Sequence, residues 1–486
     1  MKDMIINGKD YGLTVEPTEF GLLIREKRLE RNLSMRKFAE IIDGKISGLD
    51  PDKSFSVSAV IDSRKAKPNT FFAAFKGEKV DGHDYALAAI ALGAEFALTS
   101  KPISGPHILV SDVQMALTRL AKYNRDHLSE LKLVAITGSQ GKTTAKDLTA
   151  HLLQVLGKTI APEASLNNEL GVPLLLLQCD ESTKYCVVEM GARHKGDIAK
   201  LTELASPNIG LVLNVGTAHL GEFGSQEAIA ETKGELIAGL PDTGIAILGT
   251  YDQLTPKMAA GMGLKTVYFG EKSDCDVRAA DIEIREGRAN FDLVTSGGRA
   301  PVSLQLLGAH QIANALAAAS VASTLGMSVE SMAAVLSTAE PSSKWRMELI
   351  DAGDIAIIND SYNANPESMT AALRTLALLA QERGGVAWAI LGKMHELGAS
   401  SAHQHESIGK IASDIGIDHL ISVNVPEYVQ KGECDVHLVA DFDGALAFTE
   451  HFTGGDVVLV KASRAENFNL LCDAIAKKIS ERNTEK

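Results

Sequence analysis

Residues 133–144 of this chain read LVAITGSQGKTT, a short apolar run followed by a glycine-rich turn and the start of a helical pattern. The apolar run suits a buried strand, and the glycines allow the backbone to curl around phosphate oxygens. Lys142 can then reach the outer phosphates, and the hydroxyl of Thr143 can bind Mg²⁺. The segment predicts a strand–loop–helix unit that binds a nucleoside triphosphate; a glycine-rich turn without a ligand is the alternative.

The loop departs from the common phosphate-binding pattern G-x-x-x-x-G-K-[ST]. Ile136 occupies the position five residues before Gly141, and Gly138 opens the loop only three residues before it. This shorter form narrows the families to which the chain can be compared.

The composition of the 486 residues excludes several classes of protein. A net charge of −14 disfavours a general nucleic-acid binder or a protein of anionic membrane surfaces. No apolar run approaches the roughly 18 residues that span a membrane, and the first residues lack the apolar stretch of a signal peptide. The five cysteines are scattered, so we expect reduced thiols and neither zinc ligands nor disulfides. These features predict a cytoplasmic protein whose partners are neither nucleic acids nor membranes. We also expect a monomer.

The hydrophobic pattern divides the chain near residues 130 and 340. Short strand-like runs and an alanine-rich helical stretch come first, and strands alternating with helices follow. Such alternation, clearest at KLVAIT, YCVVEMG and NIGLVLNVG, is typical of a parallel sheet with helices on both faces. Five more strand-like runs near the C-terminus predict a second doubly wound domain. The fold class is therefore α/β with three domains, 1–130, 131–340 and 341–486.

Residues 1–33 form an N-terminal extension. The segment FGLLIREKRLERNLSMRKFAEII has helical periodicity and vaguely resembles two helices of a helix-turn-helix DNA reader. No third, groove-reading helix follows, so an amphipathic helix packed on the first domain is the favoured interpretation. The alternative is a phosphate-loop regulatory protein that binds DNA through this extension.

Polar residues at strand ends predict a metal site beside the phosphate loop. Glu189 ends the run YCVVEMG, and His219 follows the run NIGLVLNVG. Ligands bind outside the carboxyl ends of parallel strands, so these side chains and Thr143 are expected to converge. Oxygen ligands suit Mg²⁺, which a neutral imidazole can join. A strand-end Glu or His taken alone is more often a solvated or structural residue.

Eight motifs in a fixed order identify a family. They are TGSQGKTT, SLNNELGVP (165–173), VVEMGARHKGDIAKL (187–201), NVGTAHLGEFGS (214–225), ETKGEL (231–236), NDSYNANPESM (359–369), LGKMHELG (391–398) and VKASR (460–464). Together they resemble the Mur ligases, ATP-dependent enzymes of peptidoglycan precursor synthesis. The segment DSRKAKPNTFFAAFKGEKVDGHDY (62–85) resembles the uridine-nucleotide-binding domain of that family.

The resemblance implies a uridine-nucleotide-binding domain, a central ATPase domain and a C-terminal Rossmann-like domain. The motifs NNELGVP, VEMGARHKGDI and YNANPESM favour a member that joins D-alanyl-D-alanine to a UDP-muramoyl-tripeptide through an acyl phosphate, using ATP and Mg²⁺ at two sites. The nearest alternatives are the sister ligase that adds the third amino acid and a folylpolyglutamate-type ligase. Asn-Ala-Asn-Pro at 363–366, where the sister ligase carries D-N-P-[RA], disfavours the first of these. The third residue of the tripeptide and the preference for the dipeptide stay open.

The resemblance also assigns roles to individual residues. Nucleotide contacts are implied for Gly138, Ser139, Gln140, Gly141, Lys142, Thr143, Thr144, Asn314, Arg346 and Asp360. Metal ligands are implied at Thr143, Glu189, His219 and Lys233, with Lys142, Lys233 and His219 as catalytic residues. Lys233 matches a lysine that the family carries as a carbamate; by itself it would be interpreted as a solvated helix lysine. Substrate contacts are implied for Ser63, Arg64, Lys76, Gly77, Asp81, His83, Asn167, Asn168, Tyr362, Asn363 and Asn365. Loop capping is the plainer role for Asp81, His83, Asn363 and Asn365.

Three segments depart from the family pattern. This chain has GTYD at 249–252 where N-A-D-D is frequent, LGKMHELG where LGDMLELG is common, and VKASR for VKGSR. The first departure removes an amide and a carboxylate near the nucleotide, and the second puts the basic Lys393 near the dipeptide. None of them touches the phosphate loop or the implied metal ligands.

Overall fold

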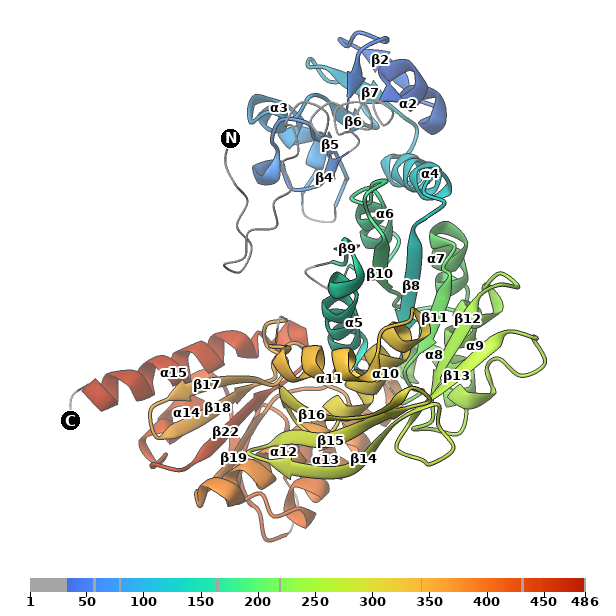
Figure 1. Cartoon of the computed structure of the whole chain (residues 1–486). Helices are drawn as coiled ribbons and strands as arrows, with labels where there is room; N and C mark the ends of the chain where they lie inside the picture. The colour runs from blue at the N-terminus through green and yellow to red at the C-terminus, as the bar shows by residue number, and fades with distance from the viewer. Residues whose placement is uncertain are drawn as a thin grey trace, which may run out of the picture. The chain divides into compact units, whose positions relative to one another are not determined.

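The computed structural model describes residues 33–55, 58–77, 80–162, 166–217, 220–341, 343–429 and 432–484. Contacts divide the chain into two compact units, one of Met1–His127 with Leu176–Gln178 and one of Leu128–Leu175 with Cys179–Lys486. Figure 1 shows the elements of both units along the chain.

The first unit is built on a five-stranded sheet with the strand order β2-β7-β6-β5-β4. Its strands are β2 (Lys45–Ser47), β4 (Ala59–Val60), β5 (Phe71–Ala73), β6 (Ala97–Thr99) and β7 (His107–Leu109). All neighbours pair in parallel except β2, which runs antiparallel to β7. The alanine-rich stretch forms the helix α3 (Ala86–Ala91), as the sequence predicts.

The helix α2 (Met35–Ile42) belongs to the core of this unit. Ser34 caps its N-terminus, and the ring of Phe38 packs edge-on against Phe71 and Phe96. The buried face confirms an amphipathic helix packed on the first domain for residues 35–42. Residues 1–32 of the predicted extension lie outside the described residues.

The second unit begins with a nine-stranded sheet in the order β16-β15-β14-β13-β12-β11-β8-β10-β9. Seven neighbouring strands of this sheet pair in parallel. In sheet order they are β9 (Thr159–Ile160), β10 (Tyr185–Glu189), β8 (Lys132–Thr137), β11 (Ile209–Val212), β12 (Ile245–Gly249), β13 (Lys265–Gly270) and β14 (Val277–Arg285). The last two strands, β15 (Arg288–Thr295) and β16 (Gly298–Leu307), are antiparallel. This hairpin extends the predicted parallel sheet and was not anticipated.

Helices cover both faces of this sheet. On one side α5 (Lys142–Leu156), α10 (Gln311–Thr324) and α11 (Val329–Thr338) share one apolar core with the strands. Helix α9 (Gln226–Ala238) packs on β11 and β8 and against α7 (Asp197–Ala205). Because the strands that flank β8 run parallel to it, their carboxyl ends meet where the phosphate loop begins.

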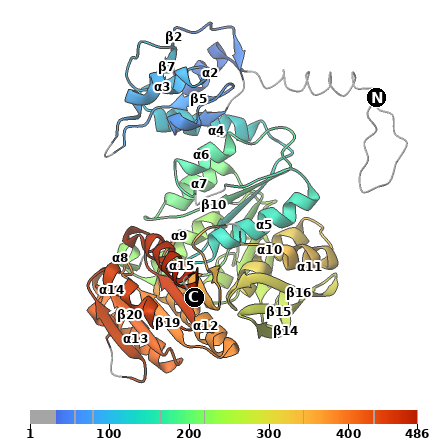
Figure 2. The same cartoon turned by 90° about the vertical axis from the view of Figure 1, so that its left-hand side faces the viewer.

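The C-terminal part of the second unit is a six-stranded sheet in the order β17-β18-β22-β19-β20-β21. Only β17 (Glu348–Ala352) is antiparallel; the others are β18 (Ile355–Asn359), β19 (Ala387–Leu391), β20 (His419–Val423), β21 (Asp435–Val439) and β22 (Val457–Lys461). One apolar cluster joins the sheet to α12 (Pro366–Arg383) and α13 (Ser401–Asp414), and another joins it to α14 (Phe442–Ala447) and α15 (Phe468–Thr484). Figure 2 shows these two helical layers. The five predicted strands and the doubly wound arrangement are confirmed.

Among the described helices, none is both long enough and apolar enough to cross a bilayer.

Candidate active site

The phosphate loop lies between β8 and α5, as predicted. Gly141 has φ +82°, and a Cβ there would collide with the carboxamide of Asn314, so only glycine fits. Lys142 opens α5, and its Nζ donates to the carbonyl of Gly138 at 2.7 Å. Burial lowers the pKa of Lys142, although the carboxylate of Glu189 opposes this shift. The loop thus offers backbone amides for phosphate oxygens, with the ammonium group of Lys142 beside them.

Neighbouring strands hold the loop in place. The backbone N–H of Ser139 donates to the carbonyl of Asn214 at 3.0 Å, and that of Gln140 donates to the Asn214 side chain at 3.2 Å. The hydroxyl of Ser139 accepts a bond of 2.8 Å from the N–H of Gly216. The loop is therefore fixed to the segment that follows β11, which leads to His219.

The carboxylate of Glu189 ends β10 directly beside this loop. It is only 1% exposed, and its oxygens accept hydrogen bonds of 2.9 Å from the hydroxyl of Thr143 and from the side-chain amide of Asn167. The structure therefore brings Glu189 and Thr143 together, as predicted for two ligands of one ion. His219, the third predicted ligand, lies outside the described residues. Asn168 lies next to this group and caps the turn before α6 (Gly171–Leu176), accepting from the N–H of Gly171 at 3.0 Å.

Lys233 is a buried lysine on α9. It is 7% exposed, and among the described residues it makes neither a hydrogen bond nor an ion pair. Burial lowers the pKa of Lys233 well below its usual value, and the charge of Lys142 lowers it further. A solvated helix lysine is therefore the wrong interpretation of this position.

The donor set near the loop fits Mg²⁺ in part. The hydroxyl of Thr143 and the carboxylate of Glu189 are the oxygen ligands that Mg²⁺ prefers. Lys233 itself offers no oxygen ligand, so that position fits Mg²⁺ only if its nitrogen carries an anionic group with oxygen atoms.

A cavity of about 270 Å³ adjoins α5 and the linker around Arg346. Thr144 and Arg346 both line it, together with Asp147 and Ser343, which hydrogen bond to each other at 2.6 Å. The guanidinium of Arg346 stacks 3.9 Å from the ring centre of Tyr362. Two predicted nucleotide contacts, Thr144 and Arg346, thus share one cavity.

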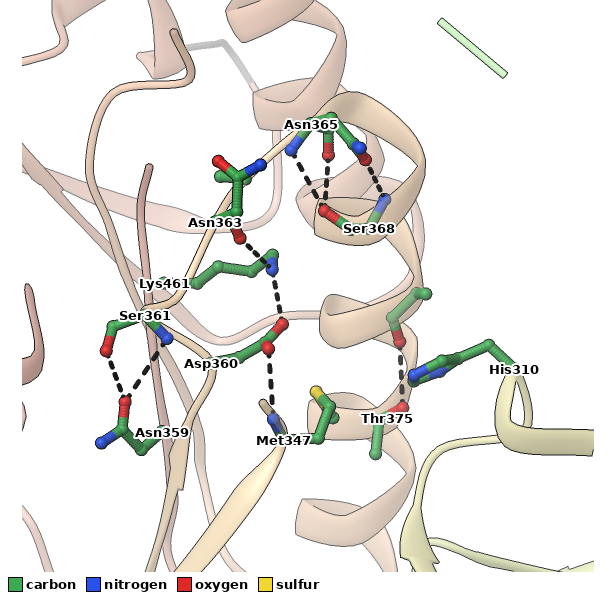
Figure 3. A network of polar contacts seen from close by, with 12 residues as sticks. His310, Met347, Asn359, Asp360, Ser361, Asn363, Asn365, Ser368, Thr375 and Lys461 are labelled. Atoms are coloured by element: carbon green, nitrogen blue, oxygen red, sulfur yellow. Dashed lines mark hydrogen bonds and ion pairs between the residues drawn. The ribbon is translucent and has the colours of Figure 1, made fainter. Parts of the chain in front are cut away.

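The loop of the C-terminal motif NDSYNANPESM (359–369), here called the signature motif, is held by a buried ion pair (Figure 3). The Nζ of Lys461, 1% exposed, lies 2.5 Å from Oδ2 of Asp360 and donates to the carbonyl of Asn363 at 2.9 Å. The other oxygen of Asp360 accepts from the N–H of Met347 at 3.1 Å. Asn365 caps the N-terminus of α12, and its side chain and that of Ser368 each accept from the other residue's backbone N–H. This capping box confirms the predicted capping role of Asn365. Both carboxylate oxygens of Asp360 are thus engaged within the chain.

The predicted uridine contacts lie in the first unit. Arg64 pairs with Asp62 through two bonds of 2.9 and 2.8 Å and is otherwise exposed. Asp81 caps the 3₁₀ turn Gly82–Tyr85 by accepting from the backbone N–H of His83, which confirms capping for Asp81; it also pairs with Lys101 at 2.6 Å. These hydrogen bonds lower the pKa of the Asp81 carboxyl.

The remaining predicted contacts of this unit lie on the same loops. Ser63 begins a 3₁₀ turn with Arg64. The backbone of Lys76 forms an isolated antiparallel β-bridge with that of Asp81, and the N–H of Gly77 donates to the carbonyl of Val80 at 2.9 Å.

Comparisons with known proteins agree with this geometry. The Mur ligase middle domain matches residues 136–322, the Mur ligase glutamate ligase domain matches 345–464, and the Mur ligase family catalytic domain matches 58–125. The UDP-N-acetylmuramoyl-tripeptide–D-alanyl-D-alanine ligase of Mycobacterium bovis is 37% identical over an alignment that covers 91% of this chain and 97% of that protein. The chain belongs to the Mur ligase family.

Solved Mur ligases share the fold. MurF from Acinetobacter baumannii matches with a TM-score of 0.83 and 30% identity, covering 92% of this chain and 99% of that one. The MurF ligase of Thermotoga maritima, solved with ADP, matches with a TM-score of 0.76 and 28% identity, covering 88% and 99%. The predicted three-domain α/β fold and the class of ATP-dependent amide-forming ligase are confirmed; the exact domain boundaries stay predictions.

One residue of this Mur ligase was missed by sequence reasoning. Glu367, in the first turn of α12, accepts a hydrogen bond of 2.6 Å from the backbone N–H of Thr217. Thr217 lies in the motif NVGTAHLGEFGS, two residues before His219, and its own hydroxyl is buried without a partner among the described residues. Acidic residues are common in the first turn of a helix, where they interact favourably with the helix dipole. The sequence alone therefore does not distinguish Glu367 from such a residue, and only the tertiary structure shows its contact with Thr217.

Proposed function

We propose that this Mur ligase joins D-alanyl-D-alanine to a UDP-N-acetylmuramoyl-tripeptide, with conversion of ATP to ADP and phosphate, in the synthesis of peptidoglycan precursors. The observation that carries the proposal is the phosphate loop packed against Glu189, in a chain that matches ligases of this name over nearly its whole length. The ADP in the Thermotoga relative supports ATP as the nucleotide.

In the first step the terminal carboxylate of the tripeptide attacks the γ-phosphorus of ATP. A carboxylate oxygen forms a bond to phosphorus, the bond to the β–γ bridging oxygen breaks, and ADP leaves. The amides of residues 138–141 and the cation of Lys142 hold the phosphates and offset the charge that gathers on the transferring group. Lys142 must leave the carbonyl of Gly138 to do so, and that single bond of 2.7 Å is its only described tether.

Mg²⁺ fits beside the loop, where Thr143, Glu189, His219 and Lys233 are the ligands that we propose for two ions. When bound there, Mg²⁺ supplies charge neutralisation and orientation of the phosphates.

The amine of Lys233 has no partner among the described residues, and this supports its modification to a carbamate. Its lowered pKa favours the neutral amine, whose lone pair can attack CO₂; the nitrogen loses one proton and becomes –NH–COO⁻. The change turns a buried neutral amine into an anionic oxygen ligand. A buried carbamate anion is stable only when it is paired, and Mg²⁺ held by the same ligands would supply the opposite charge.

In the second step the amine of D-alanyl-D-alanine attacks the carbonyl carbon of the acyl phosphate. A tetrahedral intermediate loses phosphate and a proton, which leaves the new amide. Water would hydrolyse the acyl phosphate, so we propose that the C-terminal domain closes on the central domain during turnover. The hydrogen bond between Thr217 and Glu367, which already joins these two domains, supports this part of the proposal.

The remaining assignments are part of the same proposal. Residues of the first unit hold the uridine diphosphate, Asn167 and Asn168 approach the muramoyl group, and Tyr362, Asn363 and Asn365 approach the dipeptide. The nucleotide is contacted by Asn314 and Arg346. Asp360 contributes through its ion pair with Lys461. We further propose a cytoplasmic monomer.

A substrate panel tests the proposal. ADP formation should require the UDP-muramoyl-tripeptide, and amide product should also require D-alanyl-D-alanine. Equal turnover with a UDP-muramoyl-dipeptide and a free diamino acid would instead assign the chain to the sister ligase. Turnover with a folate and glutamate would assign it to the folylpolyglutamate-type enzymes.

A further inference from the structure

Two neighbouring strands of the C-terminal domain bring two histidines and an aspartate together. His419 begins β20 and Asp435 begins β21, and these two residues are direct partners in the parallel pairing. His437 lies two residues beyond Asp435 and pairs with Ile421. Side chains two apart on a strand share a face, so all three residues project from the same face of the sheet.

The three side chains present their ligand atoms to a common point. Nδ1 of His419 lies 3.5 Å from Oδ2 of Asp435, Nε2 of His437 lies 3.2 Å from the same oxygen, and the two nitrogens are 3.4 Å apart. Ligands about 2.0–2.1 Å from a tetrahedral Zn²⁺ ion are separated by about 3.3–3.4 Å. The three atoms therefore already form one triangular face of such a tetrahedron.

We propose that His419, Asp435 and His437 bind a divalent transition-metal ion of the Zn²⁺ class. Two imidazoles and one carboxylate are a donor set that zinc accepts, and a water molecule would complete the four-coordinate shell. The side chains are 29%, 61% and 29% exposed in that order, so an ion can enter without unfolding.

Neighbouring aromatic rings hold the two imidazoles in place. The indole of Trp388 stacks on His419 with ring centres 3.9 Å apart, and Phe448 lies 4.7 Å from the ring of His437. The backbone N–H of Asp435 donates to the backbone carbonyl of Asp418 at 2.9 Å, which fixes the start of the strand. Little side-chain entropy is therefore lost on binding.

The site is separate from the ligase chemistry. It lies at the amino ends of β20 and β21, whereas Asp360 and Lys461 lie at the carboxyl ends of β18 and β22. Imidazole nitrogens favour zinc, nickel or copper over Mg²⁺, which prefers oxygen ligands, so the Mg²⁺ used with ATP would not fill it. A bound ion would cross-link the edge strand β21 to β20, its neighbour in the sheet.

The test is calorimetric titration of Zn²⁺ into the metal-free full-length protein and into His437→Asn. His403→Asn is the matched control, because His403 is an exposed histidine on α13, which covers the other face of the sheet. Other groups of the chain also bind zinc, so the readout is the difference between variants. Wild type and His403→Asn should bind one more ion than His437→Asn, or bind it at least about tenfold more tightly.

Thermal unfolding gives a second readout. Zn²⁺ should raise Tm more in wild type than in His437→Asn, and Asp435→Asn should repeat the loss if His437→Asn does not fold. Identical Zn²⁺ stoichiometry and affinity in wild type and the ligand variants would overturn the proposal and leave a hydrogen-bonded cluster without a metal.

Discussion

The carboxylate of Glu367 in the C-terminal domain accepts a hydrogen bond of 2.6 Å from the backbone N–H of Thr217 in the central domain. Oε1 of Glu367 also lies against Gly216, where a Cβ would approach it to 2.9 Å. The start of α12 is thereby joined to the loop that leads to His219. The signature motif of the C-terminal domain thus helps to hold a loop of the ATPase site.

Glu367→Ala should lower kcat/KM by roughly 10- to 150-fold, because a hydrogen bond to a charged group contributes about 1.5–3 kcal/mol and each 1.36 kcal/mol is a factor of about ten. Glu382→Ala is the matched control: Glu382 is also on α12 and accepts a 3.0 Å bond from the N–H of Gly287, far along the chain from the loop. Steady-state kinetics of both variants check the prediction. Equal losses in the two would mean that Glu367 only stabilises the domain contact.

Lys142→Ala should lower kcat by roughly a hundredfold or more, the effect expected when a charge aimed at the transferring phosphoryl group is lost. The fold should persist, because Lys142 makes a single bond, to the Gly138 carbonyl. Exposed Lys132, at the start of β8, provides the control variant Lys132→Ala. Single-turnover ADP formation, with circular dichroism to confirm folding, gives the measurement. A normal kcat in folded Lys142→Ala would show that ATP reacts elsewhere.

Lys233→Ala and Lys233→Arg should both be nearly inactive if the lysine carries a carbamate, because neither side chain can take up CO₂. Acetate or formate should partly restore Lys233→Ala by supplying a carboxylate at the vacated position, and should not restore Lys233→Arg. Rates with and without added acetate check both statements. Near-normal activity in Lys233→Arg would reject the carbamate, since a positive charge would then suffice.

Asp360→Asn should destabilise the protein by about 3 kcal/mol or more, because it leaves the buried ammonium of Lys461 without its carboxylate. Glu231→Gln breaks the pair between Glu231 and Lys195, both largely exposed, and should cost less than about 1 kcal/mol. Denaturant unfolding monitored by tryptophan fluorescence compares the two. A loss of ATP affinity in Asp360→Asn without loss of stability would instead make Asp360 a direct nucleotide contact.

Local patterns explain why much of this site could be predicted from the sequence. The phosphate loop needs a left-handed glycine at 141 and a lysine at the helix start, and both are written in consecutive residues. The role of Glu189 could be predicted because it ends a buried strand. The capping role of Asn365 could be predicted because an asparagine directly before a proline is typical of a helix start.

Features decided by distant residues could not be predicted in this way. The bond between Thr217 and Glu367 joins positions 150 residues apart. The burial of Lys233 is set by packing of α9, although one local signal existed. Lys233 stands in a stripe with Ile229, Leu236 and Ile237, the i, i+4, i+7, i+8 spacing of a helix's buried face. The hairpin of β15 and β16 was not predicted, because alternation of strands with helices indicates parallel pairing and gives no signal for an antiparallel extension of the sheet.

The acyl phosphate is the central claim, and isotope transfer tests it most directly. The tripeptide substrate carries ¹⁸O in its terminal carboxylate, and the phosphate released during ligation to D-alanyl-D-alanine is examined by mass spectrometry. The carboxylate oxygen that attacks phosphorus must leave with the phosphate when the amine attacks, so the released phosphate should carry one ¹⁸O atom for each amide formed. Unlabelled phosphate, formed at the same rate as amide, would contradict the account.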